Sequence, residues 1–597
     1  MRSTRRRHDV PCSGRLVRGT FLLAALPVGL LAFAQAGRAD VIADVNQQVL
    51  NIIQNTSGAL IDGPPNVARE IAMVNGAMYD AVNAASGGTG SSGSLYYHGG
   101  PVANASAQAA ALSAAVTVMN SLYGAGSLYA QYAGVTGAAF YGAGSPYAGT
   151  SIGPTNIQYA AVLQDIQNIQ TQLNSLANST QVTNGTTVGA AAGNAMIAGR
   201  ANDKGAQAMT STLNYVAPVG PQAPGVYIPP TSRPALEPTN APGTGAAAVT
   251  PFIISAATVS ALTAANAPGP SPLNSAAYAK QLLTTECEGS SVALSASIGA
   301  ACSAAGFLPQ STAKTVAALY WNDPGGTYQP PGHLLQIADA AAASQNISLL
   351  AHSQLDALVG AAMSDAGAAA WDVKYAINRW RPITAIRDCA NWNPNFTTCD
   401  TTWNSLIATP PHPDYIAGHP AFSGAAATVL DNFFQTDAIA FTVSSQAYCN
   451  GGATTRDAAG NTTGCTLGGI TYTAGDPNPN HACNNAATQQ ILIVNTISGA
   501  FDANPLYNGS PLICPISETF AGFQEASSGD LGSTFSRISG GIHTPQAVLD
   551  ALAVGNAIGQ SLSNQANIPE PGMMAVLTVA LMGMAMARRR DIASLVR

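Results

Sequence analysis

Residues 374–382 read Lys-Tyr-Ala-Ile-Asn-Arg-Trp-Arg-Pro and hold three cationic side chains in a chain of 597 residues of which 9% are charged. Lys374 and Arg381 are seven residues apart, so on a helix they would share a face across two turns. Pro382 restricts the residue before it, which predicts that Arg381 lies near a helix end. Arg379 falls off that face and is expected to form a salt bridge elsewhere. Alone, the pair is more typical of a surface lysine and a salt-bridged arginine.

A second stretch passes from proline-rich backbone at 410–417 into the alanine-rich segment 418–436. Gly418 and His419 stand where this predicted helix begins. Free N–H groups at a helix start favour an anion. A histidine there can donate a proton to a bound oxyanion or accept one from a substrate. Alone, a histidine at such a junction is more often structural.

The third stretch is 536–543, which contains Arg537 and His543 on either side of a Gly-Gly turn. Thr544 and Pro545 resemble an N-cap followed by proline at the first helical position. His543 is therefore expected just ahead of a helix. Together the three stretches supply guanidinium forks, an ammonium, backbone donors and imidazoles, which are the groups that bind a tetrahedral oxyanion such as phosphate or vanadate.

The order K-x6-R-P, G-H and S-R-x5-H resembles the signature of the vanadium-dependent haloperoxidases and the related type 2 acid phosphatases, the PAP2 superfamily. The likeness covers roughly residues 45 to 565 and is strongest at 325–435 and around 537–545. Flanking segments favour the haloperoxidase branch: 69–83, 330–333, 365–372 and 380–386.

The resemblance implies a cofactor, a reaction and residue roles. Vanadate would be held by three cationic side chains and one backbone N–H, those of Lys374, Arg381, Arg537 and Gly418. His543 would be the axial metal ligand, and His419 the acid–base residue. The reaction would be oxidation of halide by hydrogen peroxide to hypohalous acid, and relatives suggest a homodimer.

Several positions depart from the family pattern. Ala417 replaces the usual serine, and the missing hydroxyl would weaken anion binding by ~1–2 kcal/mol unless Ser423 or a water replaces it. Ala547 stands where an aspartate often orients the ligand histidine, and Asp550 follows one turn later. His412 lies where bromide-using relatives carry histidine, which favours bromide or iodide.

Composition and periodicity predict a mainly α fold, a helical bundle or bundles with long irregular loops. Segment 215–275 is expected to be irregular and to line the entrance to the site. Segment 440–484, which is rich in Gly, Asn and Cys, is expected to be an inserted loop with a short hairpin. Helices are expected at 40–85, 103–125, 155–203, 330–347, 350–386, 418–436, 485–503 and 543–564.

Both ends resemble targeting signals. Residues 1–39 have an arginine-rich start, an apolar run and small residues, which predicts a signal peptide cut after Ala39. Residues 568–597 contain Pro-Glu-Pro, a sixteen-residue apolar run and three arginines, and resemble the PEP-CTERM sorting signal that an exosortase processes in Gram-negative bacteria. A membrane anchor is the alternative at each end, and the short C-terminal run favours transient anchoring. The haloperoxidase-like domain would then be 40–567, with its core motifs in 325–565.

Cysteine usage agrees with export to the cell envelope, outer surface or extracellular matrix. Eight cysteines follow the signal, and neighbouring pairs are the simplest disulfides: 287–302, 389–399, 449–465 and 483–514. Because the sequence contains no Cys-x-x-Cys pair, it gives little support for a zinc site built from cysteines. Histidines His333 and His352 are expected as structural partners, and His98 and His481 as loop residues.

Net charge is −7 and basic residues are dense only at the two ends, which argues against nucleic-acid binding. Two alternatives to the peroxidase stay open. One is an acid phosphatase that uses the same pocket, with His543 as nucleophile. The other is a non-catalytic envelope or matrix protein, which Ala417 and Ala547 keep open.

Overall fold

The computed structural model describes a large helical unit that begins at Asp40. The described residues are 40–58, 61–88, 94–145, 148–203, 223–228, 249–291, 293–307, 311–390, 392–445, 453–456, 462–467, 470–473 and 517–566. Within them, no helix combines the length and the apolar character needed to cross a bilayer. The two predicted targeting segments, 1–39 and 568–597, lie outside the described residues.

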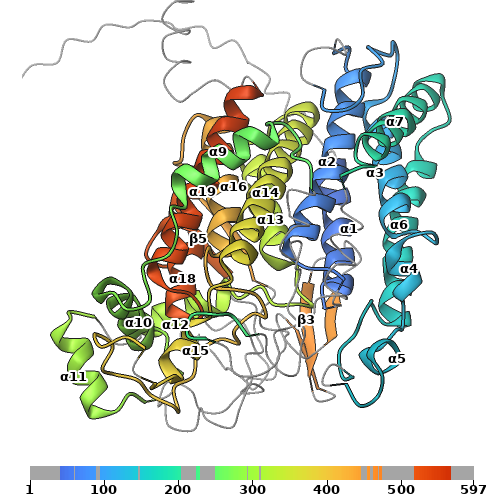
Figure 1. Ribbon diagram of the computed structural model, residues 1–597. Coiled ribbons are helices and arrows are strands. Elements are labelled where there is room, and N and C mark those ends of the chain that lie inside the picture. Colours follow the sequence, from blue (N-terminus) through green and yellow to red (C-terminus); the bar gives the residue numbers. More distant parts are fainter. Residues whose placement is uncertain are drawn as a thin grey trace, which may run out of the picture. The chain divides into compact units, whose positions relative to one another are not determined.

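The predicted mainly α fold is confirmed, and its helices form two neighbouring groups (Figure 1). The first group is α1 (Val41–Thr56), α2 (Pro64–Ala85), α3 (Ala107–Tyr123), α6 (Asn156–Ser175) and α7 (Thr180–Gly199). The second is α9 (Ala256–Asn266), α13 (Gln329–Gln345), α14 (Leu349–Ile377), α16 (Gly418–Phe434) and α19 (Pro545–Gln565). Helix α2 packs along α14, and buried apolar residues of both groups form one continuous core.

Short elements connect and cover these helices. They are α4 (Leu128–Tyr132), α5 (Gly137–Tyr141), α10 (Ala276–Glu288), α11 (Ala296–Ala304), α12 (Thr312–Tyr320), α15 (Pro382–Arg387), α17 (Phe523–Ser528) and α18 (Ser533–Ser539). Strand β1 (Phe441–Ser444) pairs antiparallel with β5 (Ser517–Phe520), with Phe441 opposite Phe520. The hairpin expected in segment 440–484 is present as β2 (Ala453–Arg456), β3 (Thr462–Leu467) and β4 (Ile470–Thr473), an antiparallel sheet in that order.

Small residues bring α16 and α19 unusually close. A Cβ on Gly555 would lie 2.3 Å from the carbonyl oxygen of Ala421, so only glycine fits there. At the start of the same pair, the Ala417 N–H donates to the carbonyl of Ala547 at 2.9 Å. The two alanines that depart from the family pattern therefore lie at one tight helix contact, and both are fully buried.

Three helix predictions need correction. The expected helix 350–386 ends at Ile377, because Asn378 takes a left-handed conformation (φ 54°) and its N–H caps the Lys374 carbonyl at 2.7 Å. Segment 215–275 is not wholly irregular, since Ser255 caps α9 within it. Segment 40–85 is two helices, because Pro64 and Pro65 start a new one. Helix 485–503 lies outside the described residues.

Two of the four expected disulfides are confirmed. Cys287–Cys302 joins α10 to α11, and Cys389–Cys399 closes the loop after α15. Cys449, Cys483 and Cys514 lie outside the described residues, so the other two pairs stay predictions.

Candidate oxyanion site

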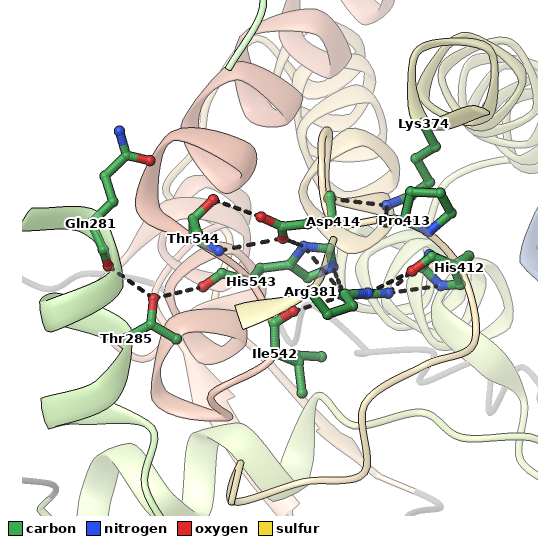
Figure 2. Close-up of polar contacts among 10 residues, drawn as sticks. All are labelled: Gln281, Thr285, Lys374, Arg381, His412, Pro413, Asp414, Ile542, His543 and Thr544. Carbon is green, nitrogen blue, oxygen red and sulfur yellow. Dashed lines mark hydrogen bonds and ion pairs between the residues drawn. The ribbon is translucent and has the colours of Figure 1, made fainter. Parts of the chain in front are cut away.

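The three stretches singled out in the sequence meet in one buried neighbourhood (Figure 2). The C-terminal end of α14 supplies Lys374, the start of α15 supplies Arg381, and the segment before α19 supplies His543. The proline-rich segment that precedes α16 passes between them and adds His412 and Asp414, which hydrogen-bond to Arg381 and His543 respectively.

Lys374 is fully buried, and its ammonium is held by backbone rather than by a carboxylate. Its Nζ donates to the carbonyl of Pro413 at 2.8 Å and to that of Asp414 at 3.3 Å. Burial and the positive charge of Arg381 lower the pKa of Lys374 well below its ordinary value. An anion beside this ammonium would offset both effects.

Arg381 reaches the site by a route that the helical spacing did not predict. It does not share a helix face with Lys374, because α14 has already ended; it precedes α15 in extended backbone. Its guanidinium donates from Nε to the His412 carbonyl at 2.5 Å and from Nη1 to the Ile542 carbonyl at 2.7 Å. The planar fork therefore joins the proline-rich segment to the segment that carries His543.

One ring nitrogen of His543 hydrogen-bonds to a carboxylate, and the other faces a cationic side chain. Nδ1 lies 2.6 Å from Oδ1 of Asp414, and Nε2 lies 2.9 Å from Nη1 of Arg381. Because Asp414 accepts a proton from Nδ1 and Arg381 can only donate, the proton belongs on Nδ1 and Nε2 carries a lone pair. Burial, followed by the charges of Arg381 and Lys374, lowers the pKa of His543, which keeps the ring neutral.

Asp414 is a residue of the candidate site that sequence reasoning missed. Its Oδ2 accepts from Thr544 Oγ1 at 2.8 Å, so the residue that begins α19 holds the carboxylate that orients the histidine before it. Asp550, which was considered for this role, instead accepts from Tyr415 at 2.6 Å. The signal that could have found Asp414 was an aspartate five residues before His419 in a proline-rich segment.

The start of α16 supplies Gly418 and His419 as expected. No side chain caps this helix, since Ala417 is its N-cap, which leaves the first N–H groups for another acceptor. A Cβ on Gly418 would lie 2.8 Å from the Trp371 ring, so a larger residue would not fit. Ser423 is fully buried, and its hydroxyl oxygen accepts a hydrogen bond from Oγ of Ser527 at 3.1 Å.

His419 and Arg537 each leave a buried nitrogen without a partner among the residues that the structure describes: Nε2 of His419 and Nη1 of Arg537. Arg537 is anchored through its other nitrogens, with Nη2 donating to the Trp321 carbonyl at 2.5 Å and Nε to Ser536 at 3.1 Å. Burial and the charge of Arg537 lower the pKa of His419, so its ring is neutral and can accept a proton. Burial lowers the pKa of Arg537 to about 9.

The indole Nε1 of Trp371 is, after Nη1 of Arg537, a second buried donor at this site that lacks a partner in the described part of the chain. Its ring centroid lies 5.0 Å from that of His412 and 5.5 Å from Nζ of Lys374. Unpartnered buried donors are costly unless a ligand accepts from them. Unpaired donors beside a cationic cluster therefore fit an anion with several acceptor oxygens, as vanadate has.

The other residues named from the sequence lie in different surroundings. Arg379 forms no salt bridge with a described residue, contrary to expectation; its guanidinium carbon lies 4.6 Å from the Tyr278 ring centroid. His333 is a structural partner, with Nδ1 3.1 Å from Asp323 and Nε2 3.1 Å from Tyr320. His352 contacts carboxylates at the opposite end of α14.

This chain is similar in sequence and in fold to vanadium-dependent haloperoxidases. Residues 354–568 match the family model described as the VCPO second helical-bundle domain. A vanadium chloroperoxidase from Curvularia inaequalis is 28% identical over 138 residues, which is 20% of this chain. The chain spans only 23% of the length of that relative in this match.

A fold similar to that of this chain is found among solved structures. The first bacterial vanadium-dependent iodoperoxidase aligns with a TM-score of 0.53 at 17% identity, over 88% of this chain and 96% of that chain. A holo-type bacterial vanadium-dependent chloroperoxidase aligns with a TM-score of 0.46 at 13% identity, over 85% of this chain and 92% of the other. The helical arrangement of this chain is thus similar to that of the iodoperoxidase.

Proposed function

We propose that this chain, which has the helical fold of the vanadium haloperoxidases and matches their second bundle domain over residues 354–568, uses vanadate to oxidise halide with hydrogen peroxide to hypohalous acid. The observation that carries the proposal is the neutral His543, whose Nδ1 faces Asp414 at 2.6 Å while Nε2 faces a cationic cluster. A metal-ligating imidazole needs this protonation pattern.

The residues fit vanadate as a set. Nε2 of His543 would bind the metal, and the hydrogen bond that it now accepts from Arg381 would be exchanged for that ligation. Lys374, Arg381 and Arg537 would neutralise the anion, and the Gly418 N–H would add a donor. When bound, vanadate supplies a Lewis acid that keeps its oxidation state.

His419 would hold the proton that peroxide gives up on arrival. Its ring is neutral, and its buried Nε2 accepts no hydrogen bond from the described residues. A neutral imidazole with a free lone pair is a proton acceptor at neutral pH. The nearby guanidinium of Arg537 makes it a weak base, so it can return the proton to an oxygen that leaves as hypohalous acid.

Bromide or iodide is the proposed halide. The imidazole of His412 accepts a hydrogen bond from Nη2 of Arg381 at 3.0 Å and lies beside Trp371. Burial and the charges of Lys374 and Arg381 lower the pKa of His412, so the ring is uncharged. Large, weakly hydrated halides suit an uncharged aromatic surface better than chloride does.

The test compares three reactions of the purified full-length protein. We expect halogenation of a phenolic dye in bromide or iodide with hydrogen peroxide, and we expect it to require added orthovanadate. The variant His543→Ala should lose this activity, whereas His98→Ala, which alters an exposed loop histidine, should keep it. Hydrolysis of p-nitrophenyl phosphate without halogenation would instead support the phosphatase, and inactivity in both would support the non-catalytic protein.

Export through the two terminal signals is part of the proposal. The mature chain would begin at Asp40, which caps α1 through its side chain. An exosortase-type enzyme would remove the tail at 568–597 and release the protein to the envelope, outer surface or matrix of a Gram-negative bacterium. N-terminal sequencing and intact mass of the protein recovered from the native host would check both cuts, and analytical ultracentrifugation would check the proposed homodimer.

A further inference from the structure

A second cluster of polar residues lies where α1, α13 and α14 meet, and the proposed reaction does not use it. One ligand atom from each of Asp339, His352 and Asp356 lies within 4.8 Å of the others. The Nε2 atom of His352 is 3.0 Å from Asp339 Oδ1 and 3.2 Å from Asp356 Oδ2. Helices α13 and α14 thus each place a carboxylate beside the same imidazole nitrogen.

The other ring nitrogen of His352, Nδ1, hydrogen-bonds to a different carboxylate. Nδ1 lies 2.5 Å from Oδ2 of Asp40, the residue that caps α1. A carboxylate that accepts the Nδ1 proton leaves Nε2 as the ring nitrogen that can bind a metal ion. Nε2 faces one carboxylate oxygen each of Asp339 and Asp356, and these oxygens call for a positive charge at that point, which either a proton on Nε2 or a metal ion can supply. Carboxylate–histidine–metal sites have this same order of groups.

A second observation also points to a cation. Asp356 is fully buried, yet its Oδ1 atom has no hydrogen-bond partner among the described residues. Asn46 is also fully buried, and its Nδ2 donates to Asp339 and Asp356 at 2.8 Å each, while its Oδ1 accepts no bond from the described chain. Rotation of this amide by half a turn would direct its oxygen toward the same point and add a fourth ligand.

We propose that Asp339, His352 and Asp356 bind a divalent cation of the zinc class and thereby fasten α13 to α14. One imidazole and two carboxylates are a donor set that suits zinc, with a fourth place for Asn46 Oδ1 or water. The Asp339 side chain is 17% exposed and gives the ion a path from solvent. His352 and Lys374 are 22 residues apart on one helix, or ~33 Å along its axis, so this site is separate from the oxyanion site.

Without the cation, a proton takes its place. Burial opposes charge on His352, but Asp356, Asp339 and Asp40 together raise its pKa far above the ordinary value.

The experiment uses the full-length protein, treated with a chelator and titrated with zinc by calorimetry. We expect one equivalent to bind, and Asp339→Asn to weaken binding at least ~10-fold. The matched control is Asp44→Asn on α1, whose carboxylate contacts Gln172 instead; it should bind as the wild type does. His543→Ala should also bind zinc normally, which separates this site from the oxyanion pocket.

A second measurement needs no variant. One equivalent of zinc should raise the melting temperature of the wild-type protein, and a chelator should reverse the rise, because the ion joins helices that separate on unfolding. Absence of stoichiometric binding, binding that Asp339→Asn leaves unchanged, or an unchanged melting temperature would each overturn the proposal.

Discussion

Replacing Asp414 by asparagine should disable His543 as a metal ligand while leaving the shape of the pocket intact. In the wild type, Oδ1 can only accept, so the ring proton stays on Nδ1 and Nε2 is free. An asparagine amide can donate to Nδ1 instead, which favours the tautomer with its proton on Nε2. That tautomer has no lone pair for vanadate.

The expected loss of vanadate affinity can be estimated from the hydrogen bond between His543 and Asp414. The bond is short, at 2.6 Å, and the side chains of His543 and Asp414 are 3% and 1% exposed, so solvent does not compensate for its loss. A hydrogen bond to a buried charged group is worth ~1.5–3 kcal/mol, which corresponds to a vanadate affinity ~10- to 150-fold weaker. Replacement of groups that orient a metal-ligating histidine has effects of the same order.

The assay is equilibrium binding of orthovanadate to the vanadate-free protein, followed by ultrafiltration and metal analysis, so it does not depend on turnover. Thr544→Val should give a smaller loss in the same direction, because it removes the 2.8 Å bond that holds Asp414 in place. Asp550→Asn is the matched control, since that carboxylate bonds to Tyr415, and its affinity should stay within about twofold of wild type. Wild-type affinity in a folded Asp414→Asn variant would refute the orienting role.

Three further predictions test other parts of the molecule. Arg537→Lys should weaken vanadate binding by ~10-fold in the same assay, since one ammonium cannot both bond to the Trp321 carbonyl and present the free Nη1 donor. Burial raises the pKa of Glu286 from 4.5 to about 8, so the native state holds a proton that the unfolded state loses. This group therefore makes stability fall by at most about 1.4 kcal/mol per pH unit from pH 4.5 to 8. Urea unfolding of Glu286→Gln should show a correspondingly flatter pH dependence than the wild type, and parallel curves would contradict the assignment. Cys302→Ser opens the disulfide across 15 residues and should lower the free energy of unfolding by about 3 kcal/mol, again by urea titration, whereas an unchanged midpoint would show that the bond does not constrain the unfolded chain.

Helix positions were readable from the sequence where apolar spacing was regular, as in α13, α16 and α19. The predicted helix bounds were wrong where a single residue changed the direction of the backbone. Asn378 ends α14 in a left-handed conformation, and no apolar pattern marks that stop because alanine and tyrosine continue the helical spacing up to it. Helix α9 was missed because its flanks are rich in proline and glycine, although Ser255 gave a capping signal.

The residues of the candidate site were identified from motifs, but their arrangement was not. Lys374 and Arg381 were expected to meet because they share a helix face, whereas they meet because the chain turns back after Asn378. Asp414 could not be assigned, since its role depends on a partner 129 residues away and on the hydroxyl of Thr544. Contacts of this range are decided by the packing of α16 on α19, which local spacing does not encode.

The charge distribution of the pocket explains how one set of residues can serve two needs. Vanadate binding requires positive charge, while metal ligation and proton acceptance require imidazoles without a proton. The charges that attract the anion, on Arg381, Arg537 and Lys374, are among those that lower the pKa values of His543 and His419. The histidines are neutral because they are buried and because the cations are close. Removing a cation should therefore weaken the electrostatic attraction and also raise the proton affinity of the proposed ligand. The site is consequently one coupled electrostatic unit, and the effects of substitutions within it should not add.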